Sequence, residues 1–104
     1  MGIVSWSKLS QLDLLNIADY IAKDSPIVAI NFVEKILTYA KDLGNYPERG
    51  RIVPEFDKSN LRELIFQNYR IIYQVSDNKD VNIVTVTHGA MDLKLKYEKE
   101  KWQL

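Results

Sequence analysis

Several residue types and patterns that often reveal a protein's function are absent from this sequence. It has no cysteine, which excludes disulfides and thiolate metal sites, and its single histidine offers too few ligands for a zinc site. No apolar run approaches the roughly 18 residues that span a bilayer, and the opening MGIVSWSKLS lacks the charged and apolar blocks of a secretion signal. We therefore expect a cytoplasmic protein with no metal, no cofactor and no membrane partner.

An excess of charge of either sign is also absent. The chain has 14 lysines and arginines and 14 aspartates and glutamates, whereas proteins that grip nucleic acid are usually markedly basic. The chain does have enough apolar residues to form one hydrophobic core, because 46% of its 104 residues are hydrophobic. We expect a single domain over residues 1–104.

Two segments in the first half of the chain have the apolar spacing of helices. Residues 3–6 resemble a short strand, and Ser7 follows them as a helix N-cap. A helix is predicted over residues 8–23, and a second one begins at Ser25-Pro26 and ends before Gly44. The link between them is short, so the pair should form an antiparallel hairpin. Their apolar stripes are Leu14, Ile17, Ala18 and Ile21 in the first helix, and Ala29, Phe32, Val33, Ile36, Leu37, Ala40 and Leu43 in the second.

The second half of the chain has the period-two alternation of strands. Residues 45–56 contain two prolines and a glycine and are expected to be a loop. Strands are predicted over residues 61–66, 69–75 and 81–88, with short turns that imply antiparallel neighbours. The mostly charged tail from Asp92 to Leu104 is either a short helix or a mobile end. The predicted fold is α+β, in the order β-α-α-β-β-β, with the helical hairpin packed on one face of an antiparallel sheet.

Arginine is confined to one region of the sequence. Alternation in YRIIYQV, residues 69–75, places Arg70 on the face opposite the helices, where its guanidinium could reach water or an anionic ligand. All four arginines lie between positions 49 and 70, so they are a candidate recognition surface for phosphate or carboxylate. The alternative is that they pair with Glu48, Glu55, Asp57 and Glu63 in ordinary surface ion pairs. The candidate target-binding residues are Arg49, Arg51, Arg62 and Arg70.

A small sheet also leaves apolar surface that a partner can cover with a strand or a helix. The apolar strand residues that the helical hairpin does not need are the expected docking groove. They are Leu64, Ile72, Val84 and Val86.

Taken together, several segments resemble the RelE/ParE superfamily of type II toxin-antitoxin toxins over residues 3–97. They are DLLNIADYIA, AINFVEKI, YPERGRIVPEF, LREL, NYRIIYQV and VNIVTVTHGAMDL, in that order along the chain. The resemblance implies a toxin that is neutralised by a cognate antitoxin and carried by bacterial plasmids or chromosomal islands for their stable maintenance. It also allows a homodimer or a toxin-antitoxin hetero-oligomer.

Members of this superfamily use one of two mechanisms. RelE-like toxins cut mRNA on the ribosome, which requires a cation for the phosphate and groups that move protons, but no metal. The resemblance places Arg70 at the phosphate-binding position, and the other candidates for this metal-independent endoribonuclease are Glu63 or Glu55, His88 and Tyr97. A histidine at a strand end is also commonly a hydrogen-bonded structural residue.

ParE-like toxins share the fold but poison DNA gyrase without cutting RNA. This chain departs from the nuclease pattern, because Leu61, Glu63 and Met91 stand where cations are usual. It also lacks the positive charge that favours binding to ribosomal RNA. The sequence therefore favours the ParE-like mechanism over the RelE-like one. A third hypothesis is an inactive remnant that still binds the antitoxin.

Overall fold

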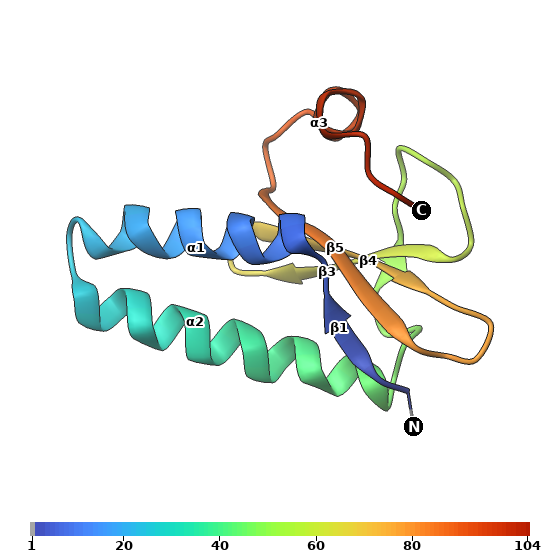
Figure 1. The fold of residues 1–104 in the computed structure, drawn as a ribbon, viewed down its shortest axis with the longest axis horizontal. Coiled ribbons are helices and arrows are strands. Elements are labelled where there is room, and N and C mark those ends of the chain that lie inside the picture. Colours follow the sequence, from blue (N-terminus) through green and yellow to red (C-terminus); the bar gives the residue numbers. More distant parts are fainter. Residues whose placement is uncertain (1) are drawn as a thin grey trace.

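The α+β fold predicted from the sequence is confirmed in the computed structural model, which describes residues 2–104. Figure 1 shows a helical hairpin on one side of a twisted sheet and a short helix at the other end of the chain. No helix among the described residues is long and apolar enough to cross a membrane. The elements are β1 (Val4–Trp6), α1 (Lys8–Ala22), α2 (Pro26–Lys41), the 3-10 turn η1 (Asp42–Gly44), β2 (Arg51–Ile52), β3 (Leu61–Phe66), β4 (Tyr69–Val75), β5 (Val81–His88) and α3 (Leu93–Glu100).

Both long helices begin at the predicted N-caps. The Ser7 hydroxyl accepts a hydrogen bond from the N–H of Ser10, and the Ser25 hydroxyl accepts one from the N–H of Val28. These bonds satisfy backbone donors that the first turn of a helix leaves free. The tail of the chain, for which the sequence left two possibilities, forms α3, capped by the Asp92 carboxylate.

The five strands form one sheet in the order β1-β5-β4-β3-β2. The bounds of β3, β4 and β5 are those predicted, whereas β2 is a two-residue strand within the expected loop. β1 pairs with β5 in parallel, so the expectation of a wholly antiparallel sheet was wrong. The helical hairpin between β1 and the other strands allows this arrangement, because parallel neighbours need a long crossover connection.

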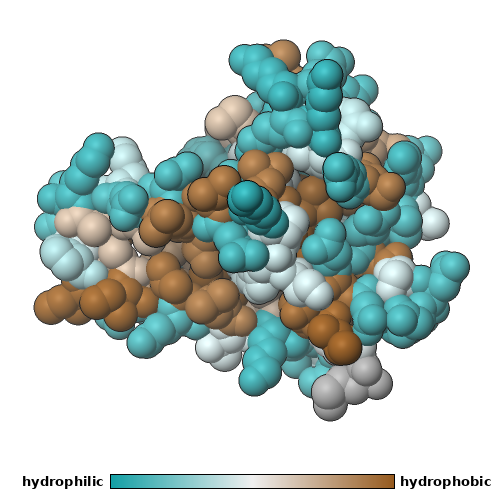
Figure 2. All heavy atoms as spheres, viewed as in Figure 1, coloured by the Kyte–Doolittle hydropathy of each residue, from teal (hydrophilic) through white to brown (hydrophobic). Residues whose placement is uncertain are grey.

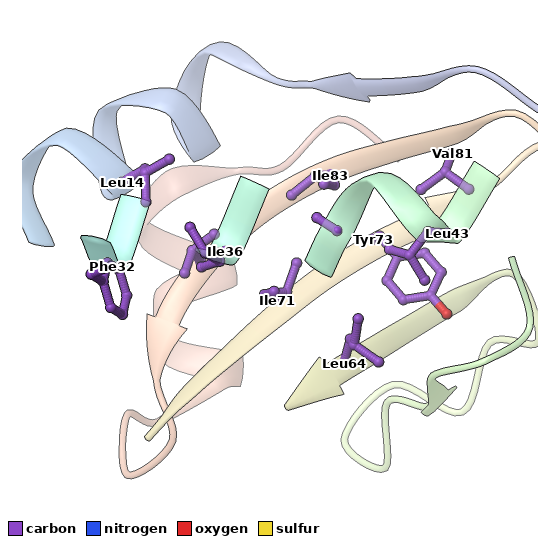
Figure 3. Packing of buried hydrophobic residues seen from close by; sticks show 11 residues of the cluster. Leu14, Phe32, Ile36, Leu43, Leu64, Ile71, Tyr73, Val81 and Ile83 are labelled. Carbon is purple, nitrogen blue, oxygen red and sulfur yellow. The ribbon is translucent and has the colours of Figure 1, made fainter. Parts of the chain in front are cut away.

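The helical hairpin covers one face of the sheet and forms the main core. Tyr69, Ile71, Tyr73 and Val75 of β4 all pack toward it, as the alternation predicted. In Figure 3 the side chains of Phe32 and Ile36 from α2 lie over those of the strands, and the Tyr73 hydroxyl points out toward the loop before β2.

The opposite face of the sheet carries a second, smaller core. Trp102 and Leu93, from the C-terminal segment, cover Ile72 and Val84 of the strands. The predicted docking groove is therefore not open: Leu64 and Val86 belong to the main core, and all four of its residues are at most 6% exposed. For Ile72 and Val84 the prediction failed because the charged tail of the chain supplies large apolar side chains to this face. For Leu64 and Val86 it failed because both side chains point toward the helical hairpin.

Tyr73 links the main core to the loop before β2. Its ring is fully buried, and its hydroxyl accepts a hydrogen bond from the Gly50 N–H at 2.9 Å and donates one to the Pro47 carbonyl at 2.8 Å. Burial raises the pKa of Tyr73, so this stabilisation is fully present below the ordinary value of about 10 and is lost at higher pH.

Replacing Tyr73 with phenylalanine is expected to lower the free energy of unfolding by about 1–3 kcal/mol, because the Gly50 N–H and the Pro47 carbonyl lose their buried partner. Urea denaturation at neutral pH measures the change. Tyr46→Phe is the matched control: that ring is 62% exposed, and the change should stay within about 0.5 kcal/mol. Equal effects at the two positions would contradict the role of the hydroxyl.

Candidate functional site

Arg70 lies on the predicted face of the sheet, opposite the helical hairpin, but it is not open to solvent. The residue is only 7% exposed. Its Nε donates to Glu63 Oε1 at 2.6 Å, while Nη1 and Nη2 donate to the two carboxylate oxygens of Glu55, each at 2.8 Å. The expectation that this guanidinium reaches water or a foreign anion is therefore corrected, because two carboxylates of the same chain already occupy it.

The strand register explains how these charges meet. Glu63 is opposite Ile72 in the β3-β4 pair, which makes it the diagonal neighbour of Arg70 on the same face. Arg51 of β2 is opposite Glu63, and its Nε donates to Glu63 Oε2 at 2.5 Å. Glu55 comes from the loop after β2. The Arg70 cluster, as we call Arg51, Glu55, Glu63 and Arg70, thus holds two cations and two carboxylates.

The charges in the Arg70 cluster stabilise one another. The bidentate bond to Glu55 and then the contacts with Glu63 raise the pKa of Arg70 despite its burial. The hydrogen bonds from Arg70 in turn hold the pKa of Glu55 below its ordinary value. The Glu63 side chain has no exposed surface, and its ion pairs with Arg70 and Arg51 offset the free-energy cost of burying its charge. The cluster is neutral overall and presents no net positive charge to a phosphate.

The four arginines do not form one surface. Arg62 is opposite Tyr73 in the register and so lies on the face of the helical hairpin; its Nη1 donates to the Gly50 carbonyl at 2.8 Å. Arg49 pairs with Asp42 at 2.8 Å and lies over the ring of Tyr39. Arg51 and Arg70 therefore pair with Glu55 and Glu63, two of the acidic residues named from the sequence, whereas Arg49 pairs with Asp42, which was not named.

Two of the candidate proton-transfer groups, His88 and Tyr97, make no hydrogen bond or ion pair with Arg70 and have other partners. His88 is opposite Tyr69, whose side chain lies on the hairpin face. The two rings meet edge to face, with their centroids 5.8 Å apart. Its Nδ1 accepts a hydrogen bond from the Ala90 N–H at 3.1 Å. Tyr97 packs against Phe56 and Trp102. Of the other proposed nuclease residues, only Glu55 and Glu63 are bonded to Arg70.

An apolar groove along the outside of the helical hairpin was missed by the sequence reasoning. Leu15 and Leu37 are 56% and 42% exposed, and the groove continues past Ala18 and Val33 toward the tip of the hairpin. Figure 2 shows apolar atoms gathered over α1 and α2. Leu15 and Ile30, which lie outside the apolar stripes predicted for the two helices, were the available signal, whereas Leu37 belongs to a predicted stripe and is nevertheless exposed. The outer groove is lined by Trp6, Gln11, Leu14, Leu15, Ala18, Asp19, Ala22, Pro26, Ala29, Ile30, Val33, Glu34 and Leu37.

Comparison with known proteins gives consistent matches along most of the chain. The model of a family described as the ParE toxin of the type II toxin-antitoxin system, parDE, matches residues 4–93. Toxin RelE2 of Caulobacter vibrioides is 38% identical over 91 residues, covering 86% of this chain and 98% of the relative. The putative toxin Y4kP of Sinorhizobium fredii is 38% identical over 88 residues, which cover 83% of this chain and 86% of that relative.

Two solved structures share the fold. One is the chromosomal ParDE system from P. aeruginosa, with a TM-score of 0.70 and 22% identity, covering 85% of this chain and 96% of that one. The other is the toxin-antitoxin complex RelBE2 from Mycobacterium tuberculosis, with a TM-score of 0.58 and 21% identity, covering 84% of this chain and 96% of that one. The helical hairpin and the sheet are therefore an arrangement that these structures have in common with the present chain.

Proposed function

Because the chain belongs to the ParE family of type II toxin-antitoxin toxins, we propose that it inhibits growth by binding a target protein such as DNA gyrase, and that a cognate antitoxin neutralises it. The observation that carries the choice of target is the closed Arg70 cluster. All three guanidinium nitrogens of Arg70 already donate to Glu55 or Glu63, so the paired Nη1 and Nη2 donors that would grip the phosphate of an mRNA are engaged within the chain.

Other features of the site agree with this proposal. Cleavage of RNA needs a proton donor and a proton acceptor close to the cation that binds the phosphate. His88 lies on the other face of the sheet from Arg70, with one ring nitrogen already bonded to the backbone. The net charge of zero also provides no general attraction to ribosomal RNA. Contact with a protein target requires neither property.

The outer groove is the proposed docking site for the antitoxin. It is long, apolar and lined at intervals by small alanines, which is the shape that an amphipathic helix of a partner fills. Both charged residues along it, Asp19 and Glu34, are acidic. An antitoxin helix with an apolar face and lysine or arginine beside it is therefore complementary to this groove.

Two parallel assays test the proposed target. Purified toxin is added to DNA gyrase in a supercoiling assay, and to a translation mixture in which the ends of the mRNA are mapped. We expect supercoiling to be inhibited while the mRNA stays intact, and we expect added antitoxin to restore supercoiling. Cleaved mRNA with normal supercoiling would instead identify a RelE-like endonuclease. Activity in neither assay, with no arrest of growth, would identify an inactive antitoxin-binding remnant.

A further inference from the structure

The C-terminal segment reaches back to the loop that carries Glu55. Phe56 is in that loop, and its ring lies 5.3 Å from the ring of Tyr97 and 5.7 Å from that of Trp102, between centroids. The Tyr97 and Trp102 rings are themselves 5.3 Å apart. Figure 1 shows the C-terminal end of the chain beside the loop between β2 and β3. These three side chains form an aromatic cluster one residue away from Glu55.

Glu55 is the outermost partner of Arg70. Its side chain is 30% exposed, against 9% for that of Arg70 and none for that of Glu63. Glu63 therefore supports the guanidinium from below, whereas Glu55 covers it from the solvent side. The paired bonds from Nη1 and Nη2 to the two oxygens of Glu55 have the same fork geometry that a phosphate or an external carboxylate takes on arginine.

We propose that Arg70 is an oxyanion-binding site that the chain's own Glu55 keeps closed, and that the aromatic cluster of Phe56, Tyr97 and Trp102 is the latch that holds Glu55 in place. Displacement of Glu55 changes the charge balance of the Arg70 cluster. With two cations and two carboxylates, the net charge of the cluster is zero. When Glu55 moves away, Arg51 and Arg70 are left with Glu63 alone, and the net charge becomes +1. The freed Nη1 and Nη2 then bind an oxyanion from outside.

The latch is built from a segment that depends on tertiary contacts. α3 has eight residues, too few to be stable as an isolated helix. It is held by the buried side chain of Leu93 at its start and by the packing of Trp102 after its end. Between them, Lys96 Nζ lies 3.7 Å from Asp13 Oδ1 of α1. Segments of this kind open at a lower free energy than a central sheet does. Their opening removes the packing of Phe56 and, with it, the support for Glu55.

Phosphate titration of full-length variants tests the closed site, with the Arg70 Nε–H signal observed by NMR. We expect Glu55→Gln to bind inorganic phosphate at least about tenfold more tightly than the wild type does, because the carboxylate competitor is gone. Glu98→Gln is the matched control: it removes one negative charge from an exposed position of α3 and should leave the affinity unchanged. Acetate titrated in parallel shows whether a carboxylate or a phosphate is the preferred oxyanion.

The latch is tested by Trp102→Ala, which should also increase phosphate affinity while leaving Glu55 in the sequence. Tyr97→Ala, at a partly exposed position, repeats the measurement with a milder change if the first variant fails to fold. A folded Glu55→Gln protein without the gain, or an equal gain in Glu98→Gln, would overturn the closed site. Latch variants that are folded and bind phosphate only as the wild type does would overturn the latch. The proposed function relies on the closed state of the same Arg70 cluster, but these titrations use no gyrase, ribosome or antitoxin, so their outcome is read separately from that of the supercoiling and mRNA assays.

Discussion

Replacing Arg70 with alanine is expected to lower the free energy of unfolding by about 3–5 kcal/mol, since it leaves the buried Glu63 carboxylate without its main partner. The partly exposed carboxylate of Glu55 would turn to solvent at little cost. Urea denaturation of the purified variant, monitored by circular dichroism, measures the change. The effect should be among the largest of any single substitution outside the two hydrophobic cores.

Arg49→Ala is the matched control for this prediction. It removes an arginine whose ion pair with Asp42 is exposed on both sides, at 39% and 42%, so the expected change is below about 1 kcal/mol. Equal unfolding free energies for the two variants would contradict the structural role of Arg70. A loss of toxicity in Arg70→Ala would report on folding as well as on function. Glu55→Gln, which keeps the guanidinium and its buried partner, is the cleaner probe of the site.

Replacing Leu15 with glutamate is expected to weaken antitoxin binding at least about thirtyfold, because a carboxylate would enter the apolar groove beside Asp19 and Glu34. The side chain is 56% exposed, so the toxin itself should keep its stability within about 0.5 kcal/mol. Isothermal titration calorimetry of toxin with antitoxin measures the affinity. In cells that express both proteins, the antitoxin should restore growth less well with the Leu15→Glu toxin than with the wild-type toxin.

Leu95→Glu is the corresponding control on another surface. Leu95 is 46% exposed on α3, away from the outer groove, so the same change in charge and size should leave antitoxin affinity unaltered. Undiminished affinity in Leu15→Glu would exclude the outer groove as the docking site. Comparable losses in both variants would point to the net charge of the toxin rather than to the groove.

The strands and helices were predictable because the patterns that form them are local. The alternation in YRIIYQV places Ile71 and Tyr73 under the hairpin and Arg70 on the other face, and the structure has the same arrangement. Ser7 and Ser25 marked the helix starts, because a hydroxyl that accepts from the third residue after it needs no distant partner. The parallel pairing of β1 was not predictable, since three residues do not specify which strand they join.

The Arg70 cluster shows where local patterns stop being informative. Glu55 and Glu63 were named among the acidic partners that the arginines could have, but nothing in their spacing indicated that both would close on Arg70. Glu55 is 15 residues from Arg70 in the sequence. Only the path of the loop after β2 brings the two together. The same holds for Trp102, which reaches Phe56 because α3 turns the tail of the chain back over the sheet.

The sequence by itself determined the α+β class, the bounds of three strands, the face on which Arg70 lies and the resemblance to a toxin family. The tertiary structure decided what covers each face: the guanidinium is closed by Glu55 and Glu63, and of the apolar strand residues expected to be open, two lie beneath the C-terminal segment and two beneath the helical hairpin. The reason is physical. Backbone periodicity is set by neighbours along the chain, whereas the partner of a buried charge and the cover of an apolar face are set by which distant segments can reach them.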